Sequence, residues 1–262
     1  MFDESDNCYD LIEVEGIEFR PLEKVEHKDE NQTISDSDAY CEEKFPTDYE
    51  DIMKWSTDIM QWTTKNEAYS IIRKGFLIDD GEKWFSLDKN GKKCHMLSAA
   101  YIESWNEDQL SLSGSRFKEA TLLSLSRFTI HCGIRSNLLS PQTTYATYLV
   151  YKYLPENQSR FEGPVEVSET FGSDHNHWYI YLVSPTTPVI RPNANQNTHN
   201  PVYRPKIKGI PQQRNDGWME VQIWEFQTAA TIEMIHMNLQ LTPCGATRFV
   251  GLVIQGFEVR PI

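Results

Sequence analysis

The chain has 262 residues with 38 acidic and 25 basic side chains, so its formal net charge is −13. Apolar residues make up 39% and aromatic residues 12% of the chain, which is enough for a packed core and excludes disorder throughout. The acidic total argues against a dedicated binder of nucleic acid or of anionic membranes, because both need a basic surface.

The negative charge belongs to the N-terminal part of the chain. Residues 1–60 contain 19 Asp or Glu and 5 Lys or Arg, a net charge of −14, so the other residues together carry +1. The stretch 23–46 is polar, acidic and without apolar periodicity, which predicts a linker.

Residues 1–22 contain a strand-like segment that recurs at the other end of the chain. LIEVEGIEFRPL over residues 11–22 matches GLVIQGFEVRPI over residues 251–262, with Gly, Glu, Arg and Pro at equivalent places. We interpret residues 1–22 as a remnant of the last strand of a preceding copy. Its apolar residues need cover, so we expect it to pair with a sheet edge of the main domain or of a second copy, as a homo-oligomer.

The chain shows none of the usual marks of export or membrane insertion. No apolar run reaches the roughly 18–20 residues of a membrane span, and the acidic N-terminus does not resemble a signal peptide. The five cysteines are scattered and include no CxxC pair. We therefore expect reduced thiols, a cytoplasmic or nuclear location and no membrane partner.

A helical lead-in over residues 47–75 is predicted to precede a β-rich region over residues 76–262. Thr47 with Glu50, and Thr64 with Glu67, have capping-box spacing, which predicts helices over about 48–55 and 65–74. Gly75 is expected to end the second helix.

Short apolar runs separated by turn residues dominate the rest of the chain, with Asn90-Gly91 as a strong turn pair. They predict an antiparallel β-sandwich of jelly-roll type. One short helix is expected over residues 115–123. Residues 185–213 hold six of the thirteen prolines, which predicts a long exposed loop.

Two clusters of polar residues are candidate sites on pattern alone. In GWMEVQIWEF, alternation places Trp218, Glu220, Gln222 and Trp224 on one strand face, a strip that suits a sugar or a peptide. The alternative is that Trp218 caps the core and Glu220 is solvated. The DHNHW sequence over residues 174–178 lacks a third metal ligand at suitable spacing, so a polar turn is favoured and no metal is expected.

Residues from about 76 to 262 resemble the phloem protein 2 family of plants, which includes tobacco-type lectins. The resemblance lies in five blocks that follow one another in the family's order, which are FLIDDGEKWFSLDKNGKKCHMLSA, SRFKEATLL, LLSPQTTYATYLVYKYL, RNDGWMEVQIWEF and GLVIQGFEVRPI. Many relatives carry an F-box or a kinase domain, but nothing in residues 1–46 resembles either. The resemblance implies a nucleocytoplasmic protein that binds chito-oligosaccharides or N-glycan cores without cofactor or catalysis.

The resemblance also implies a sugar site, of which this chain keeps only part. Trp105 matches the first of two tryptophans in the lectins, while the second is lost in a shortened segment before Ser115. The two acidic residues of the lectins fall at Thr231 and Asn238 by simple register, with Glu233 as the only nearby carboxylate. Each lost contact is expected to weaken the free energy of sugar binding by roughly 1–2 kcal/mol.

The favoured function is a non-enzymatic, lectin-like carbohydrate-binding module. Its candidate ligand-binding residues are Trp105, Glu233, Asn238, Trp224 and Glu220. The alternative is a protein-interaction or scaffold module that keeps the sandwich but has lost the sugar site.

Overall fold

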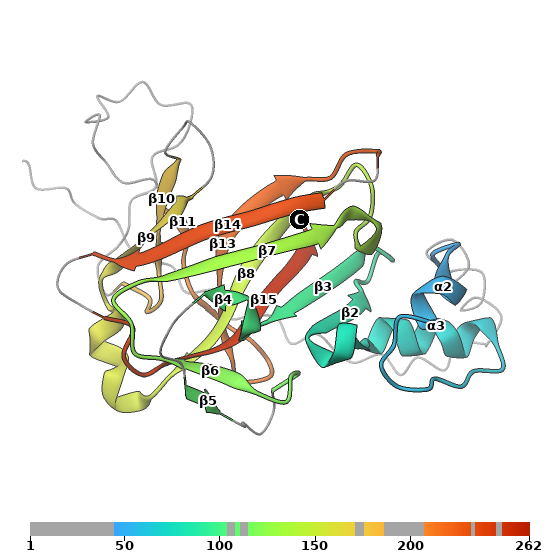
Figure 1. Ribbon diagram of the computed structural model, residues 1–262, viewed down its shortest axis with the longest axis horizontal. Coiled ribbons are helices and arrows are strands. Elements are labelled where there is room, and N and C mark those ends of the chain that lie inside the picture. The colour runs from blue at the N-terminus through green and yellow to red at the C-terminus, as the bar shows by residue number, and fades with distance from the viewer. Residues whose placement is uncertain are drawn as a thin grey trace, which may run out of the picture.

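The computed structural model describes residues 45–103, 108–110, 115–170, 176–185, 207–231, 234–244 and 248–262. In this part of the chain two β-sheets face each other across an apolar core, with a short helical region at one end (Figure 1). The predicted class, a mainly antiparallel β-sandwich preceded by helices, is therefore confirmed. The expected remnant at residues 1–22 and nearly all of the expected linker lie outside the described residues.

The helical region contains α2 (Tyr49–Met53) and α3 (Lys65–Lys74). At the start of α3, Thr64 and Glu67 form the predicted capping box, since the Thr64 hydroxyl accepts from the Glu67 backbone and the Glu67 carboxylate accepts from the Thr64 backbone. The capping box predicted for the first helix is wrong, because Asp48 is its N-cap residue and makes no side-chain cap.

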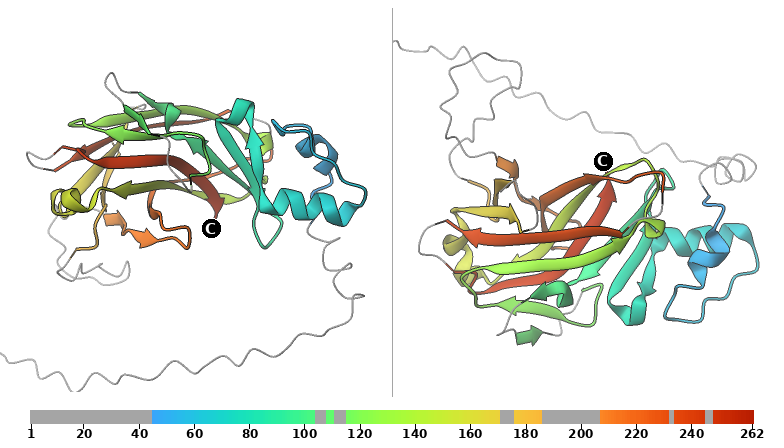
Figure 2. Two further views of the ribbon diagram at one scale, coloured as in Figure 1. Left: turned by 90° about the horizontal axis from the view of Figure 1, so that it is seen from below. Right: turned by 45° about the horizontal axis from the view of Figure 1, so that its top comes forward.

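Gly75 ends α3 as predicted, and its conformation requires glycine. Its φ is +85°, and a Cβ atom there would lie 2.4 Å from Nε1 of Trp84. The chain then enters the sheet directly, so α3 packs on the first strands. The turned views in Figure 2 show this helical region beside one end of the sandwich. It has its own apolar cluster, whose fully buried members include Ile52, Ala68, Ile72 and Phe85.

Sheet A runs in the order β1-β2-β3-β15-β8-β13-β12, with β6 also on β15 and β5 on β6. Its strands are β1 (Phe76–Ile78), β2 (Lys83–Leu87), β3 (Lys93–Ser98), β5 (Asp108–Leu110), β6 (Ala120–Leu123), β8 (Thr144–Tyr153), β12 (Gln212–Gln213), β13 (Met219–Gln227) and β15 (Leu252–Pro261). The C-terminal strand β15 is thus central, and β8 pairs with it along nearly its whole length.

Sheet B runs in the order β11-β10-β9-β14-β7-β4. Its strands are β4 (Ile102–Glu103), β7 (Phe128–Arg135), β9 (Pro164–Glu169), β10 (His177–Tyr181), β11 (Ile207–Gly209) and β14 (Met234–Pro243). All its pairs are antiparallel except β10 with β11, which is parallel. Short 3₁₀ helices connect the strands at Asp79–Gly81, Ala99–Tyr101, Ser136–Leu138 and Pro155–Phe161.

Two of the predicted elements are wrong. The helix expected over residues 115–123 is instead a bend followed by β6, because Ala120–Leu123 pair with β15 on one side and with β5 on the other. The loop expected over residues 185–213 ends early, since its last residues form β11 and β12. Pairing with strands distant in the sequence decides both cases, and no local sequence pattern predicted it.

Candidate functional site

The outer face of sheet B is polar across five strands. Each strand alternates between buried apolar residues that face the core and polar residues that face away from it. The strand registers place five polar residues opposite one another in a single row, which are His177, Ser168, Gln240, Thr129 and Glu103. The row combines an imidazole, an amide, a carboxylate and two hydroxyls, the groups that hydrogen-bond sugar hydroxyls.

An aromatic ring flanks this row at the β10 end. Tyr179 on β10 lies opposite Glu166 on β9, and its hydroxyl lies 3.3 Å from the Glu166 carboxylate. Burial and the nearby Glu166 charge raise the pKa of Tyr179 above its ordinary value. The phenol therefore stays protonated and can donate a hydrogen bond at neutral pH.

Asn238, one of the predicted ligand-binding residues, lies on the same face. It pairs with His131 on β7, two residues along β14 from Gln240 in the polar row. Its backbone carbonyl accepts from the backbone N–H of Thr170, at 3.0 Å. Its side-chain oxygen is buried and has no hydrogen-bond partner among the described residues.

Trp105 and Glu233 lie outside the described residues, but the structure describes the strands that are next to them in the sequence. Glu103, two residues before Trp105, pairs with Thr129 near the start of β7. Met234, directly after Glu233, pairs with Arg135 at the end of β7. These two β7 positions are separated by about 20 Å at ~3.3 Å per residue.

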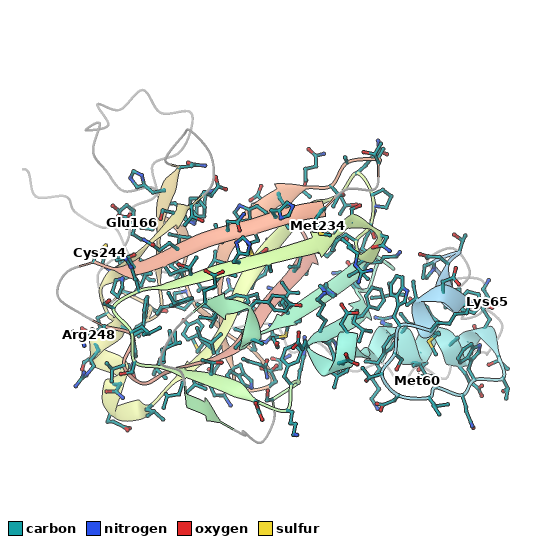
Figure 3. All side chains as sticks on the ribbon, viewed as in Figure 1. Met60, Lys65, Glu166, Met234, Cys244 and Arg248 are labelled. Atoms are coloured by element: carbon teal, nitrogen blue, oxygen red, sulfur yellow. The ribbon has the colours of Figure 1, made fainter. Side chains whose placement is uncertain are left out.

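In Figure 3 the long strands of sheet B run between Glu166 and Cys244 at one end and Met234 at the other. The polar row and Asn238 lie between these two ends. The row itself was missed in the sequence, although period-two alternation marks each of its members as outward facing. Only the register shows that they are neighbours.

The predicted strip on β13 is wrong because a β-bulge interrupts the strand. The register with β8 shifts between Gln222 and Trp224, so alternation breaks at Ile223. Trp224 therefore packs at the rim of the main core, where it stacks on Phe226 at 4.8 Å and donates to Glu169 at 2.9 Å. It does not share a face with Glu220.

Glu220 is neither solvated nor free, contrary to the alternative interpretation. It is 7% exposed, and its carboxylate accepts from Arg214 at 2.7 Å and from Arg260 at 2.8 Å. Glu258 on β15 extends this arrangement, since it accepts from Arg214 and from Arg116, the latter at 3.0 Å. We call these five residues the arginine–glutamate cluster.

The arginine–glutamate cluster stays charged in the folded protein. Burial alone would raise the pKa of Glu258, but the charges of Arg214 and Arg116 outweigh burial and hold this pKa below its ordinary value. Burial likewise would lower the pKa of Arg260, while its hydrogen bonds and attraction to Glu220 raise it. With Asp216, which lies 3.2 Å from Arg214, three carboxylates balance the three arginines on the outer face of sheet A.

Apolar side chains cover another part of that face. Trp218 is fully buried there, in a second cluster with Met96, Phe117, Val150 and Val253. It does cap apolar residues, as the alternative interpretation expected, but on the side of sheet A that faces away from sheet B. We call this group the outer apolar cluster.

Catalytic and metal-binding arrangements are not evident in the part of the chain that is described. Burial raises the pKa of Cys94 and of Cys132 to about 12, so both thiols stay protonated and unreactive. His177 lies exposed on β10. The other two candidate metal ligands in DHNHW, Asp174 and His175, lie outside the described residues. Among the described residues no group of three metal-ligating side chains occurs. Nor does any described helix have the length and apolar character that a membrane span requires.

Comparison with known proteins identifies the family of the chain. The family profile of phloem protein 2 matches residues 92–261. The chain is 30% identical to F-box protein PP2-B13 of Arabidopsis thaliana over 247 residues, which cover 87% of this chain and 87% of that protein. It is also 30% identical to F-box protein At2g02240 of the same plant over 235 residues, 86% of this chain and 69% of that protein. The chain therefore belongs to the phloem protein 2 family, whose domains are lectin-like.

Proposed function

We propose that this protein is a non-enzymatic carbohydrate-binding module that takes N-acetylglucosamine oligomers or N-glycan cores on the outer face of sheet B. The polar row from His177 to Glu103 is the observation that carries the proposal. Tyr179 lies at its edge, and family membership supports the same class of ligand. We place the protein in the cytoplasm or nucleus.

The arrangement of the polar row suits an extended oligosaccharide better than a single sugar. Neighbouring strands lie about 4.8 Å apart, so five strands span roughly 19 Å. Successive sugar units along such a row would each meet one or two polar side chains. Side-chain contacts of this kind contribute about 1 kcal/mol each, so binding should depend on the length of the oligomer.

The test is isothermal titration of the purified chain with N-acetylglucosamine oligomers of two to five units, alongside a glycan array. Gln240→Ala, in the centre of the row, should weaken binding about tenfold. Gln227→Ala is the matched control, an exposed glutamine on β13 of sheet A, and should bind like the wild type. Trp105→Ala tests the residue that the lectin resemblance implies. A glycan array without any bound glycan would overturn the proposal.

A protein-interaction module is the second candidate. The relatives described above are named F-box proteins, which supports a role in protein assembly. Ile59, between α2 and α3, is 94% exposed and is a plausible contact residue. Affinity capture with the wild type and with Ile59→Asp would separate the candidates. A protein that binds through this loop should be captured by the wild type and lost with the variant, whereas glycan binding should not change.

A further inference from the structure

A small pocket lies on the outer face of sheet A, opposite the face proposed to bind glycans. It has a volume of about 190 Å³, and eight residues line it, which are Tyr148, Lys208, Gly209, Ile210, Gln212, Glu220, Gln222 and Arg260. Tyr148, Gln222 and Arg260 form its floor from three neighbouring strands. The segment 208–212 forms its wall.

The wall is held directly against the sheet. A Cβ atom on Gly209 would lie 2.4 Å from the carbonyl oxygen of Gln222 and 2.7 Å from a methyl carbon of Val221. Only glycine allows this approach, so the position of the wall is fixed by backbone contact. The pocket is therefore a preformed feature of the fold rather than a gap between surface side chains.

Arg260 is held in place with part of its hydrogen-bonding capacity unused. Its guanidinium lies 3.7 Å from the centre of the Tyr148 ring, and Nη1 and Nη2 donate to the Glu220 carboxylate while Nη1 also approaches Glu258. Three of its five N–H groups serve these contacts. The other two have no hydrogen-bond partner among the described residues, and 32% of the side chain is exposed, so a ligand can approach the guanidinium.

The lining offers hydrogen-bond donors and cations more than acceptors. Glu220 is its one carboxylate, and both oxygens already accept from arginines. Lys208 also lines the pocket and adds a second cation, with its ammonium 4.4 Å from the centre of the Trp178 ring, and the amides of Gln212 and Gln222 add N–H donors. Gln222 also contacts the exposed Glu225 at 3.3 Å, which holds its amide in place.

We propose that this pocket binds one acidic hexose, a sugar ring that carries a carboxylate or a phosphate group. The anionic group would pair with Arg260 and Lys208, because guanidinium and ammonium groups bind such oxygens by charge-assisted hydrogen bonds. The ring hydroxyls would bond the amides of Gln212 and Gln222. This site is separate from the polar row on sheet B.

The experiment is isothermal titration of the full chain with glucuronate, glucose 6-phosphate, glucose and inorganic phosphate. Both acidic sugars should bind at least tenfold more tightly than glucose or phosphate alone. Lys208→Gln should weaken them about tenfold, and Gln212→Ala about fivefold. Both residues are exposed, so neither variant should impair folding.

Lys152→Gln is the matched control for Lys208→Gln. The Lys152 ammonium lies 4.4 Å from the Trp218 ring centre, as the Lys208 ammonium lies 4.4 Å from that of Trp178, but Lys152 does not line the pocket. It should therefore bind like the wild type. Equal affinity for glucose and glucuronate, or equal losses in both lysine variants, would overturn the proposal, whatever the result with N-acetylglucosamine oligomers.

Discussion

The outer faces of the two sheets are built from the same alternating strands, yet they differ in what lies on them. On sheet A, the outer apolar cluster and the arginine–glutamate cluster cover the face, and they bury Trp218 and Glu258. On sheet B, the polar row remains partly or fully exposed among the described residues. Outward-facing residues such as Trp218 and Glu258 are thus structural on sheet A, whereas those of the polar row on sheet B are candidate ligand contacts.

Replacing Trp218 by Ala should have the largest effect. Its side chain is fully buried, so we expect a loss of about 3–5 kcal/mol in the free energy of unfolding. Trp224→Ala should cost clearly less, because this side chain is only partly buried at the rim of the core. Urea denaturation measures both. Equal losses would contradict the assignment of Trp218 to the fully buried outer apolar cluster and of Trp224 to the partly exposed rim of the main core.

Glu258→Gln should come second, with a loss of about 3 kcal/mol. The variant leaves the buried guanidinium of Arg214 short of one of its carboxylate partners, and such a broken buried pair is costly. Glu225→Gln, an exposed carboxylate on β13, should change the free energy of unfolding by less than about 0.5 kcal/mol. If Glu258→Gln were equally mild, the arginine–glutamate cluster would be open to water rather than closed.

His95→Leu should remove part of the loss of stability in acid. Burial, helped by the nearby Lys83 charge, lowers the pKa of His95 to about 3, so below about pH 6.5 only the unfolded chain takes up this proton. The free energy of unfolding then falls by up to ~1.4 kcal/mol per pH unit between pH 6.5 and 3.

Urea denaturation at pH 7 and pH 5 measures this slope. His95→Leu should lose about 2 kcal/mol less than the wild type over that interval. His236→Gln, on the exposed face of sheet B, should keep the wild-type slope because it leaves His95 in place. The opposite result would assign the acid sensitivity to the polar face instead of the interior.

Gln240→Ala should have the smallest effect on stability, a change within about 0.5 kcal/mol, because its side chain projects from the outer face of sheet B. The same variant is expected to weaken glycan binding, so stability and binding should separate here. Thermal unfolding beside titration measures both. A large loss of stability would mean that the polar row is structural, as its counterpart on sheet A is.

Much of the fold could be predicted from local patterns. The antiparallel sandwich was predicted from short apolar runs separated by turns, and α3, its capping box and its end at Gly75 were predicted from helix-cap signals. The wrong helix and loop assignments share one cause. Residues 115–123, β11 and β12 carry no strong local signal, and they became strands or bends because neighbouring strands offered them backbone partners.

The candidate site was predicted less well, for a related reason. Alternation assigned Glu220 and Trp224 to one face, but the bulge at Ile223 moved Trp224 to the other. Asn238 comes from the resemblance to lectins and stays a prediction, whereas the polar row beside it includes residues of four other strands that only the register brings together. Trp105 and Glu233 remain predictions.

By itself, the sequence determined the class of fold, the family and the core-facing side of the strands whose alternation no bulge interrupts, because these depend on local periodicity and on shared motifs. Only the tertiary structure decided which outward-facing residues are covered, which carboxylates are paired with arginines and which polar side chains form a row. Those outcomes depend on contacts between residues as far apart as Arg116 and Glu258, and pairing over such distances leaves no mark in a local pattern.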